Sequence, residues 1–240
     1  MTREVKKFRD LNELSEAVAA DVAVLISKTV SKEGHFSLVL SGGSTPRTLH
    51  RLLGTVYREK IPWEAVSIYF GDERYVPHTD KQSNYLMAKE TLLNLIPIPA
   101  GKVHPIPTDV ADPARAAEAY DEDLREHFSE KGKSFDLVIL GIGNEGHTAS
   151  LFPDSPALDE LRRWAVFIEV PAVPHERITL TYPILNRASS IYFLVSGSDK
   201  KDALSKVQNE NFDYHTCPAK GINPDHGKLV WWVDSDAIGG

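Results

Sequence analysis

The amino-acid sequence predicts an α/β protein built on a mostly parallel, Rossmann-like sheet that helices cover on both faces. Short apolar runs, typical of buried strands, alternate along the chain with segments of helical periodicity. Several of these runs lead directly into a loop that is rich in glycine or in charge. Because no internal repeat, low-complexity tract or Gly/Ser linker divides the 240 residues, we expect a single domain over residues 1–240.

The first half of the chain is predicted to alternate between helices and buried strands. Leu14, Val18, Val22 and Ile26 recur at helical spacing and indicate an amphipathic opening helix. A later helix starts at Pro46, which suits a first turn, and ends at Gly54; a polar loop separates the second strand from a third helix. The expected strands are residues 36–40 and 66–70, and the expected helices are residues 14–26, 46–54 and 84–93.

The second half continues the alternation, and its clearest buried strand is residues 135–140. The other expected strands are residues 164–170, 178–180, 191–195 and 229–233, and the expected helices are residues 112–128 and 198–207. In open parallel sheets the ligand lies beyond the carboxyl ends of the strands. Residues 41–47, 71–74, 141–150 and 196–200 each follow a predicted strand. We therefore expect their glycines, hydroxyls, cations and histidine to meet at one rim.

The composition excludes several classes of partner. Lys plus Arg total 27 against 34 Asp plus Glu, and this net charge of −7 disfavours a wide nucleic-acid or anionic-membrane surface. Cys217 is the only cysteine, so no intrachain disulfide can form and a reducing compartment fits. Residues 1–9 have no apolar core, and no stretch approaches the ~18 apolar residues of a membrane helix. We expect a cytoplasmic protein that acts on a small molecule.

The Gly-Ser loop at residues 41–46 is a candidate anion site. Gly43 lets backbone N–H groups approach an anion, Ser44 and Thr45 offer hydroxyls, and the following helix start favours negative charge. Arg47 ends this segment with a cation. The alternative is a tight turn in which Ser44 or Thr45 is only the helix N-cap, and the two interpretations are compatible.

Charged residues follow the strand at residues 66–70. Asp72, Glu73 and Arg74 are consecutive at its carboxyl end. Three adjacent charges at that position indicate a ligand-binding site more strongly than three charges on a helix surface do. The alternative is an ion pair between Asp72 and Arg74. Arg177 and Lys200 are further candidate cations, at a strand start and a helix start, and each taken alone is as easily a surface charge.

Gly141, Gly143 and Gly146 match the dinucleotide fingerprint G-x-G-x-x-G after a strand. That fingerprint requires a full crossover helix, which Pro153 and Pro156 exclude. The glycines then make a tight loop that presents His147 at the rim. The neutral range of its pKa suits a general base, and Glu145 is placed to orient the ring.

Metal and nucleophile chemistries are disfavoured. The nine histidines include no H-x-x-x-H or H-x-x-E-H pair, and one cysteine cannot build a zinc knuckle, so we expect no metal and no cofactor. No G-x-S-x-G nucleophile elbow occurs. Water is therefore the expected nucleophile.

Taken together, these segments resemble the 6-phosphogluconolactonase family, whose fold is similar to that of glucosamine-6-phosphate deaminases and ribose-5-phosphate isomerases. The resemblance runs in order through residues 40–46, 69–85, 136–153, 177–187, 195–204 and 218–231. The run from Gly146 to Pro153 is its most specific motif. The family usually has Asp where this chain has Glu145.

The resemblance implies hydrolysis of 6-phosphogluconolactone to 6-phosphogluconate, in the oxidative pentose phosphate pathway. It implies that Ser44, Thr45, Arg177 and Lys200 hold the phosphate. By the same resemblance, Asp72 and Arg74 contact the sugar hydroxyls and the lactone oxygen, and His147 deprotonates the attacking water.

Two other functions are compatible with parts of the sequence. The first is an aldose–ketose isomerase or deaminase on the same scaffold, which would need a different segment in place of residues 71–74 and a histidine placed elsewhere. The second is a non-catalytic sugar-phosphate sensor, which would keep Ser44, Arg177 and Lys200 but has no use for His147 on a Gly-rich turn. Such a sensor usually carries a DNA-binding helix pair, which we do not find in the sequence.

Overall fold

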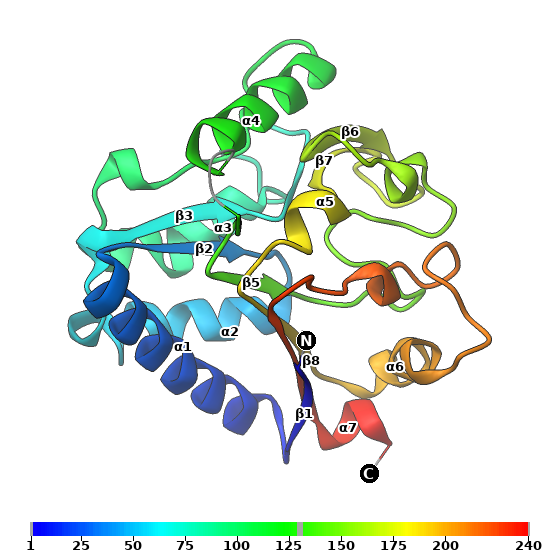
Figure 1. Cartoon of the computed structure of the whole chain (residues 1–240), viewed down its shortest axis with the longest axis horizontal. Coiled ribbons are helices and arrows are strands. Elements are labelled where there is room, and N and C mark those ends of the chain that lie inside the picture. The colour runs from blue at the N-terminus through cyan, green and yellow to red at the C-terminus, as the bar shows by residue number, and fades with distance from the viewer. Residues whose placement is uncertain (1, 129–131, 240) are drawn as a thin grey trace.

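A six-stranded, all-parallel sheet forms the centre of the structure, a computed structural model that describes residues 2–128 and 132–239 (Figure 1). In spatial order its strands are β1 (Thr2–Phe8), β9 (Lys228–Asp234), β8 (Ser190–Val195), β5 (Leu137–Leu140), β2 (Phe36–Leu40) and β3 (Val66–Phe70). All neighbouring pairs are parallel. The predicted α/β fold with a mostly parallel sheet is confirmed.

Helices cover both faces of this sheet, because each carries an apolar stripe toward it. α1 and α2 lie on one side, and α4 lies on the other (Figure 1). In α1, Leu14, Val18, Val22 and Ile26 are all fully buried, as their spacing predicts. The helices are α1 (Leu11–Glu33), α2 (Ser44–Gly54), α3 (Asn84–Thr91), α4 (Pro113–Phe128), α5 (Tyr182–Leu185), α6 (Lys201–Gln208) and α7 (Ser235–Ile238).

A second, antiparallel sheet of three strands lies beside α4 (Figure 1). Its order is β4 (Asp72–Arg74), β7 (Glu176–Leu180) and β6 (Ala165–Glu169). The prediction of a plain polar loop after residue 70 was therefore wrong, since residues 72–74 pair with β7. This pairing places Arg74 opposite Arg177, a contact that no local pattern indicates.

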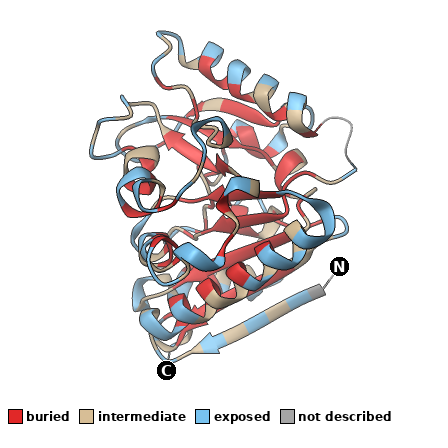
Figure 2. Ribbon diagram, turned by 90° about the vertical axis from the view of Figure 1, so that its left-hand side faces the viewer, coloured by how far each residue is buried: buried red, intermediate tan, exposed pale blue. Residues whose placement is uncertain are grey.

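The first strand, β1, was not predicted either. It forms an edge of the main sheet and pairs only with β9. Figure 2 shows it as a partly exposed ribbon next to the N-terminus, in contrast to the buried strands behind it. Val5 is 52% exposed, so this edge strand has little need of the apolar run by which buried strands are recognised.

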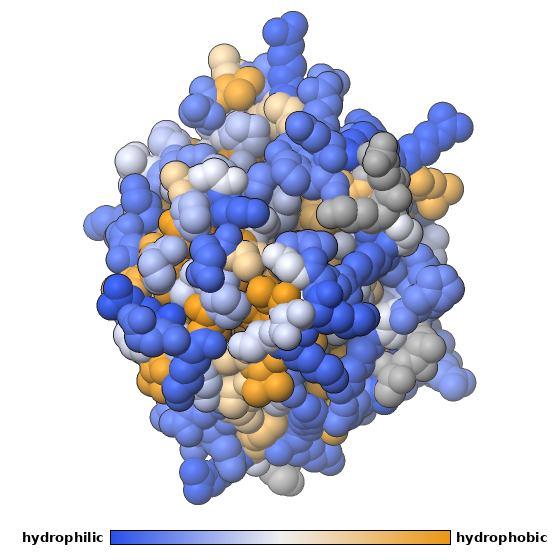
Figure 3. Space-filling model, turned by 60° about the vertical axis from the view of Figure 1, so that its left-hand side comes forward, coloured by the Kyte–Doolittle hydropathy of each residue, from blue (hydrophilic) through white to orange (hydrophobic). Residues whose placement is uncertain are grey.

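The surface agrees with the charged composition. The face turned to the viewer in Figure 3 is mostly hydrophilic, with apolar side chains gathered near its middle. Within the described part of the chain, no helix combines the length and the hydropathy that crossing a bilayer would require.

Candidate active site

A cleft of about 360 Å³ opens at the carboxyl ends of the main strands, large enough for a small metabolite. The loops after β2 and β5, the strand β4 that follows β3, and Lys200 just before α6 all reach it, so these segments meet at one rim as expected. Arg177 of β7 comes from the second sheet. The predicted residues that line the cleft are Gly43, Asp72, Arg74, His147, Arg177 and Lys200.

A tight Gly-rich loop after β5 carries His147 into the cleft. The Gly143 amide donates to the carbonyl oxygen of His147 (2.9 Å), and the Gly146 amide donates to that of Gly143 (3.0 Å). A side chain at Gly143 would place its Cβ 2.0 Å from the His147 ring, and Gly146 has a φ of +99°. No α-helix follows within residues 141–155, so the glycines present a histidine and do not cradle a dinucleotide.

The His147 ring is fixed from two sides. Phe152 stacks on it with ring centroids 4.1 Å apart and an interplanar angle of 15°. Nδ1 lies 3.1 Å from Oε2 of Glu145, off the direction of a hydrogen bond, and this buried nitrogen has no other partner. The contact is therefore mainly electrostatic, and it leaves Nε2 as the nitrogen that the cleft can use.

The electrostatics of this pair favour a neutral imidazole facing a charged carboxylate. Burial lowers the pKa of His147 below its usual range, and the Glu145 carboxylate only partly opposes this. For Glu145, burial alone would raise the pKa, but its own backbone amide and His147 outweigh that effect and hold the pKa below its ordinary value. At neutral pH His147 is thus unprotonated, as a general base requires.

Asp72 is held at the cleft wall by two neutral donors. The Ser150 hydroxyl donates to Oδ2 at 2.6 Å, and the Asn84 amide donates to Oδ1 at 3.3 Å and to the Asp72 carbonyl at 2.9 Å. The expected alternative, an ion pair between Asp72 and Arg74, does not form. Arg74 instead donates from Nη1 to the carbonyl oxygen of Gln82 at 2.6 Å.

The neighbouring Glu73 has a structural role. Its side chain is buried and accepts from the Arg74, Asn84 and Tyr85 amides at 2.7–2.8 Å and from the Ser83 hydroxyl at 3.0 Å. Burial raises the pKa of Glu73, although these four donors counteract it. Because Asn84 and Tyr85 begin α3, the carboxylate fastens β4 to this helix and so positions Asp72.

Arg177 is a buried guanidinium that forms no ion pair with any described residue, although the Asp72 and Glu73 carboxylates are near enough to favour its charge. Its residue is 4% exposed, and among the described residues Nε and Nη1 have no hydrogen-bond partner. Burial, followed by the like charge of Arg74 opposite, lowers the pKa of Arg177 below its usual value. Leaving such a group without hydrogen bonds is costly, and an anion bound beside Arg177 would reduce that cost.

The Gly-Ser loop reaches the cleft with its backbone. Gly43 is the N-cap of α2, with φ at 109° and no side-chain cap, so the alternative in which Ser44 or Thr45 caps the helix is wrong. The loop residues that line the cleft are Ser41, Gly42 and Gly43; Ser44, Thr45 and Arg47 lie on the first turn of α2 and are not among the lining residues.

Lys200 enters the cleft from the start of α6. Its ammonium donates to the side-chain oxygen of Asn144 at 2.6 Å and pairs with Asp199 at 3.1 Å. Asn144 belongs to the loop that carries His147, so this contact holds the Lys200 ammonium next to the histidine loop.

Sequence reasoning did not identify Phe152, Asn84 and Ser150 as site residues. Phe152 and Ser150 lie within the motif at residues 146–153, so their position in that run was the available signal. Asn84 lay inside a resembling segment, but its contact with Asp72 depends on how α3 packs against β4.

Comparisons with known proteins point to one family. The family model of glucosamine-6-phosphate isomerases and 6-phosphogluconolactonases matches residues 9–231. The chain is 39% identical over 227 residues to 6-phosphogluconolactonase of Synechocystis sp., covering 93% of this chain and 92% of that one. It is 36% identical to 6-phosphogluconolactonase of Nostoc sp., with 97% of each chain covered.

Solved structures are similar over the same length. The 6-phosphogluconolactonase of Thermotoga maritima superposes with a TM-score of 0.85 at 28% identity, covering 98% of this chain and 100% of that one. That of Trypanosoma brucei gives 0.84 at 29% identity, with 98% and 97% covered. A monomeric glucosamine-6-phosphate deaminase gives 0.83 at 19% identity and covers 98% of each chain, so it shares the fold.

Proposed function

This chain belongs to the family of glucosamine-6-phosphate isomerases and 6-phosphogluconolactonases, and from this membership and its cleft we infer that it hydrolyses 6-phosphogluconolactone to 6-phosphogluconate. It is thus a hydrolase of a cyclic ester in the pentose phosphate pathway. The observation in the structure that supports this most is one cleft that holds both a neutral histidine and an unpaired, buried arginine. A base and a buried cation that line one cleft suit a phosphorylated lactone.

In the proposed mechanism His147 acts as the general base. Nε2 takes a proton from water while the water oxygen forms a bond to the lactone carbonyl carbon. The tetrahedral intermediate then expels the ring oxygen, the ring C–O bond breaks, and His147 returns the proton to that oxygen. Glu145, 3.1 Å from Nδ1, stabilises the positive charge that the imidazole gains between the two steps. Arg74 stabilises the oxyanion.

The phosphate is proposed to bind to cations that line the same cleft. Arg177 provides unpaired N–H donors, Lys200 a second charge, and Gly43 opens the N-terminus of α2, where Ser44 and Thr45 add backbone N–H groups and hydroxyls. Arg47 adds positive charge on the first turn of α2, at the surface. Asp72, held by Ser150 and Asn84, is placed to accept from the sugar hydroxyls.

The two alternative functions explain less of the site. A deaminase or isomerase shares the fold, but the solved deaminase is 19% identical, whereas the curated lactonases reach 39%. A sensor would need only the cations proposed to hold the phosphate. That function leaves unexplained why Phe152 and Gly143 hold His147 in the cleft.

We also propose that the reaction needs no metal or cofactor, and that residues 1–240 act as one domain in the cytoplasm. Of the described residues that line the cleft, only His147 is a histidine, and Asp72 already accepts from two donors. That donor set is poor for zinc, which normally takes three protein ligands at a catalytic site.

A coupled assay on chelator-treated protein tests the function and the metal proposal together. Freshly prepared 6-phosphogluconolactone should be consumed faster with the dialysed protein than by spontaneous hydrolysis. The product is measured as 6-phosphogluconate, and the metal content is determined on the same sample. Activity that disappears on dialysis while the protein stays folded, and that returns with zinc, would overturn the metal-free mechanism. No acceleration by the dialysed protein or by the zinc-supplemented protein would overturn the function.

The pH dependence of kcat/KM should report the His147–Glu145 pair. Because the pKa of His147 is lowered, the base is unprotonated above about pH 6.5, and kcat/KM should fall only as the pH drops below that value. In Glu145→Gln the charge that favours the imidazolium is gone, so the acid limb should move to lower pH while kcat decreases. An acid limb that stays in place would remove Glu145 from the mechanism. Glu176→Gln, a change in the second sheet, is the matched control.

A further inference from the structure

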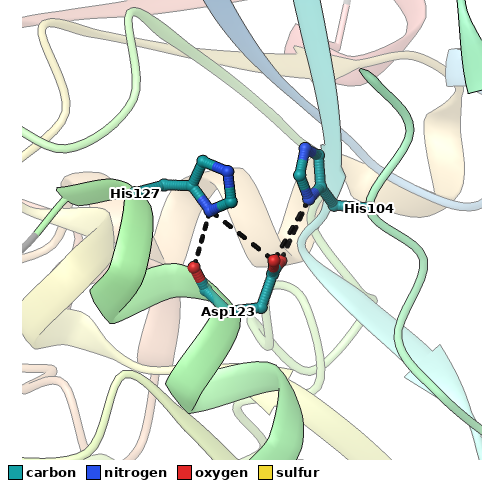
Figure 4. A group of neighbouring side chains, drawn as sticks. All are labelled: His104, Asp123 and His127. Carbon is teal, nitrogen blue, oxygen red and sulfur yellow. Dashed lines mark hydrogen bonds and ion pairs between the residues drawn. The ribbon is translucent and has the colours of Figure 1, made fainter. Parts of the chain in front are cut away.

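Two histidines and an aspartate form a cluster away from the cleft, between α4 and the segment beside β3 (Figure 4). Asp123 and His127 lie one helical turn apart on α4 and so share a face. His104 comes from the segment after residue 102, whose backbone bonds to β3 through its amide and the Ile68 carbonyl (2.8 Å). None of the three residues lines the cleft. From this arrangement we propose a binding site for a divalent ion of the zinc class.

The spacing of the donor atoms fits a small ion. Nδ1 of His104 lies 3.1 Å from one carboxylate oxygen of Asp123 and 3.3 Å from the other, and Nδ1 of His127 lies 3.5 Å from the carboxylate. Zinc–ligand bonds of about 2.0–2.2 Å in a tetrahedron place neighbouring ligand atoms about 3.4 Å apart. One ligand atom from each residue lies within 4.8 Å of the other two, so a small side-chain adjustment brings all three atoms to bonding distance from one ion.

The ligands are held before any ion binds. The His104 ring stacks on the buried Tyr69 ring at 4.4 Å and 10°, and the two histidine rings meet edge-on at 4.7 Å. Figure 4 shows the Asp123 carboxylate below and between these rings. His127 Nδ1 also faces the Asp123 carbonyl oxygen at 2.8 Å, so coordination through this atom replaces one intrahelical contact.

Charge and access also favour a cation. The ion pairs that the described residues show for the Asp123 carboxylate are both with histidines, which are cationic only when protonated. A divalent ion bound here places positive charge next to this carboxylate. The side chains of Asp123 and His127 are 32% and 38% exposed, which gives an ion and its remaining water ligands a path from solvent.

The donor set selects the kind of ion. Two imidazoles and one carboxylate suit zinc and the neighbouring transition metals, whereas calcium and magnesium prefer oxygen ligands throughout. Because the ligands come from α4 and from the segment paired with β3, the ion ties these two elements together. It should therefore stabilise the fold without taking part in lactone hydrolysis.

Titration of chelator-treated protein with Zn²⁺, in competition with a chelator of known affinity, tests the site. We expect one tight ion per chain and a melting temperature that rises on loading. His127→Gln and, separately, Asp123→Asn should weaken the affinity by about 100-fold or more and abolish the rise. The matched control is His215→Gln, since His215 also pairs with one aspartate, Asp159, at 3.5 Å and is 37% exposed.

The same titration separates this site from other zinc positions and from the lactonase reaction. His147→Ala should keep the affinity, and loss of zinc in that variant would assign the ion to the cleft and overturn the proposal. Equal affinity in the wild type and His127→Gln, or a parallel loss in His215→Gln, would also overturn it. Zinc affinity and melting temperature do not depend on turnover, so the outcome stands whether or not the chain hydrolyses lactones.

Discussion

Replacing His147 by alanine should lower kcat by about 10²–10⁴-fold, the usual contribution of a positioned general base. The site gives a physical reason for this large effect. Burial keeps the imidazole neutral, Phe152 and Gly143 fix its plane, and Glu145 lies ready to balance the charge that it gains. Binding of 6-phosphogluconate should change little, because His147 is not among the residues proposed to hold the phosphate. Turnover and product affinity measured on the same variant separate the two effects.

The control for this prediction is His226→Ala, which should leave turnover unchanged. His226 is exposed, does not line the cleft and lies just before β9, at the amino end of a strand whose carboxyl end faces the cleft. In His147→Ala the acid limb of the pH profile should also disappear, because no group remains to be protonated in that range. Near-normal turnover, or an unchanged acid limb, would mean that another group activates the water.

The position of the candidate site was predictable because most of its candidate residues lie in short segments that follow strands. The run containing His147 and the acidic segment at residues 72–74 are visible in the sequence, and the carboxyl ends of parallel strands bring them together. What the sequence could not provide was the state of each group. That Arg177 is buried and unpaired, and that Asp72 bonds to Ser150 and not to Arg74, depends on packing between distant segments.

The fold was predictable where elements are buried and not where they are edges. β5 is apolar at every position and was recognised, although the structure begins it at Leu137. β1 was missed because an exposed edge strand has no need of an apolar run, and β4 because its three residues are all charged. The His104–Asp123–His127 cluster is not visible as a pair of histidines at helical spacing. Asp123 occupies the helical position one turn before His127, and His104 comes from a different segment.

Arg177 combines a benefit for binding with a cost in stability. Its buried guanidinium has two unpaired N–H positions, and both burial and Arg74 lower its pKa. A lowered pKa in the folded state means that folding disfavours the charged form. Arginine stays charged over the accessible pH range, so this cost is present throughout; the Asp72 and Glu73 carboxylates offset part of it, and a bound anion would offset more. Under the proposed function, Arg177 therefore serves ligand binding at a cost to the stability of the fold.

Arg177→Ala should therefore weaken binding of the phosphorylated lactone by about 10- to 150-fold, which corresponds to a charge-assisted contact of roughly 1.5–3 kcal/mol. Arg177→Met, which keeps most of the volume, should at the same time raise the melting temperature of the ligand-free protein. Kinetics with 6-phosphogluconolactone and with the unphosphorylated lactone provide the decisive comparison. Only the binding of 6-phosphogluconolactone should weaken. Arg177→Lys should recover part of that binding, because lysine keeps the charge but lacks the planar guanidinium. Equal losses of binding for both lactones would show that Arg177 does not bind the phosphate. A melting temperature that falls in Arg177→Met would show that Arg177 supports the fold.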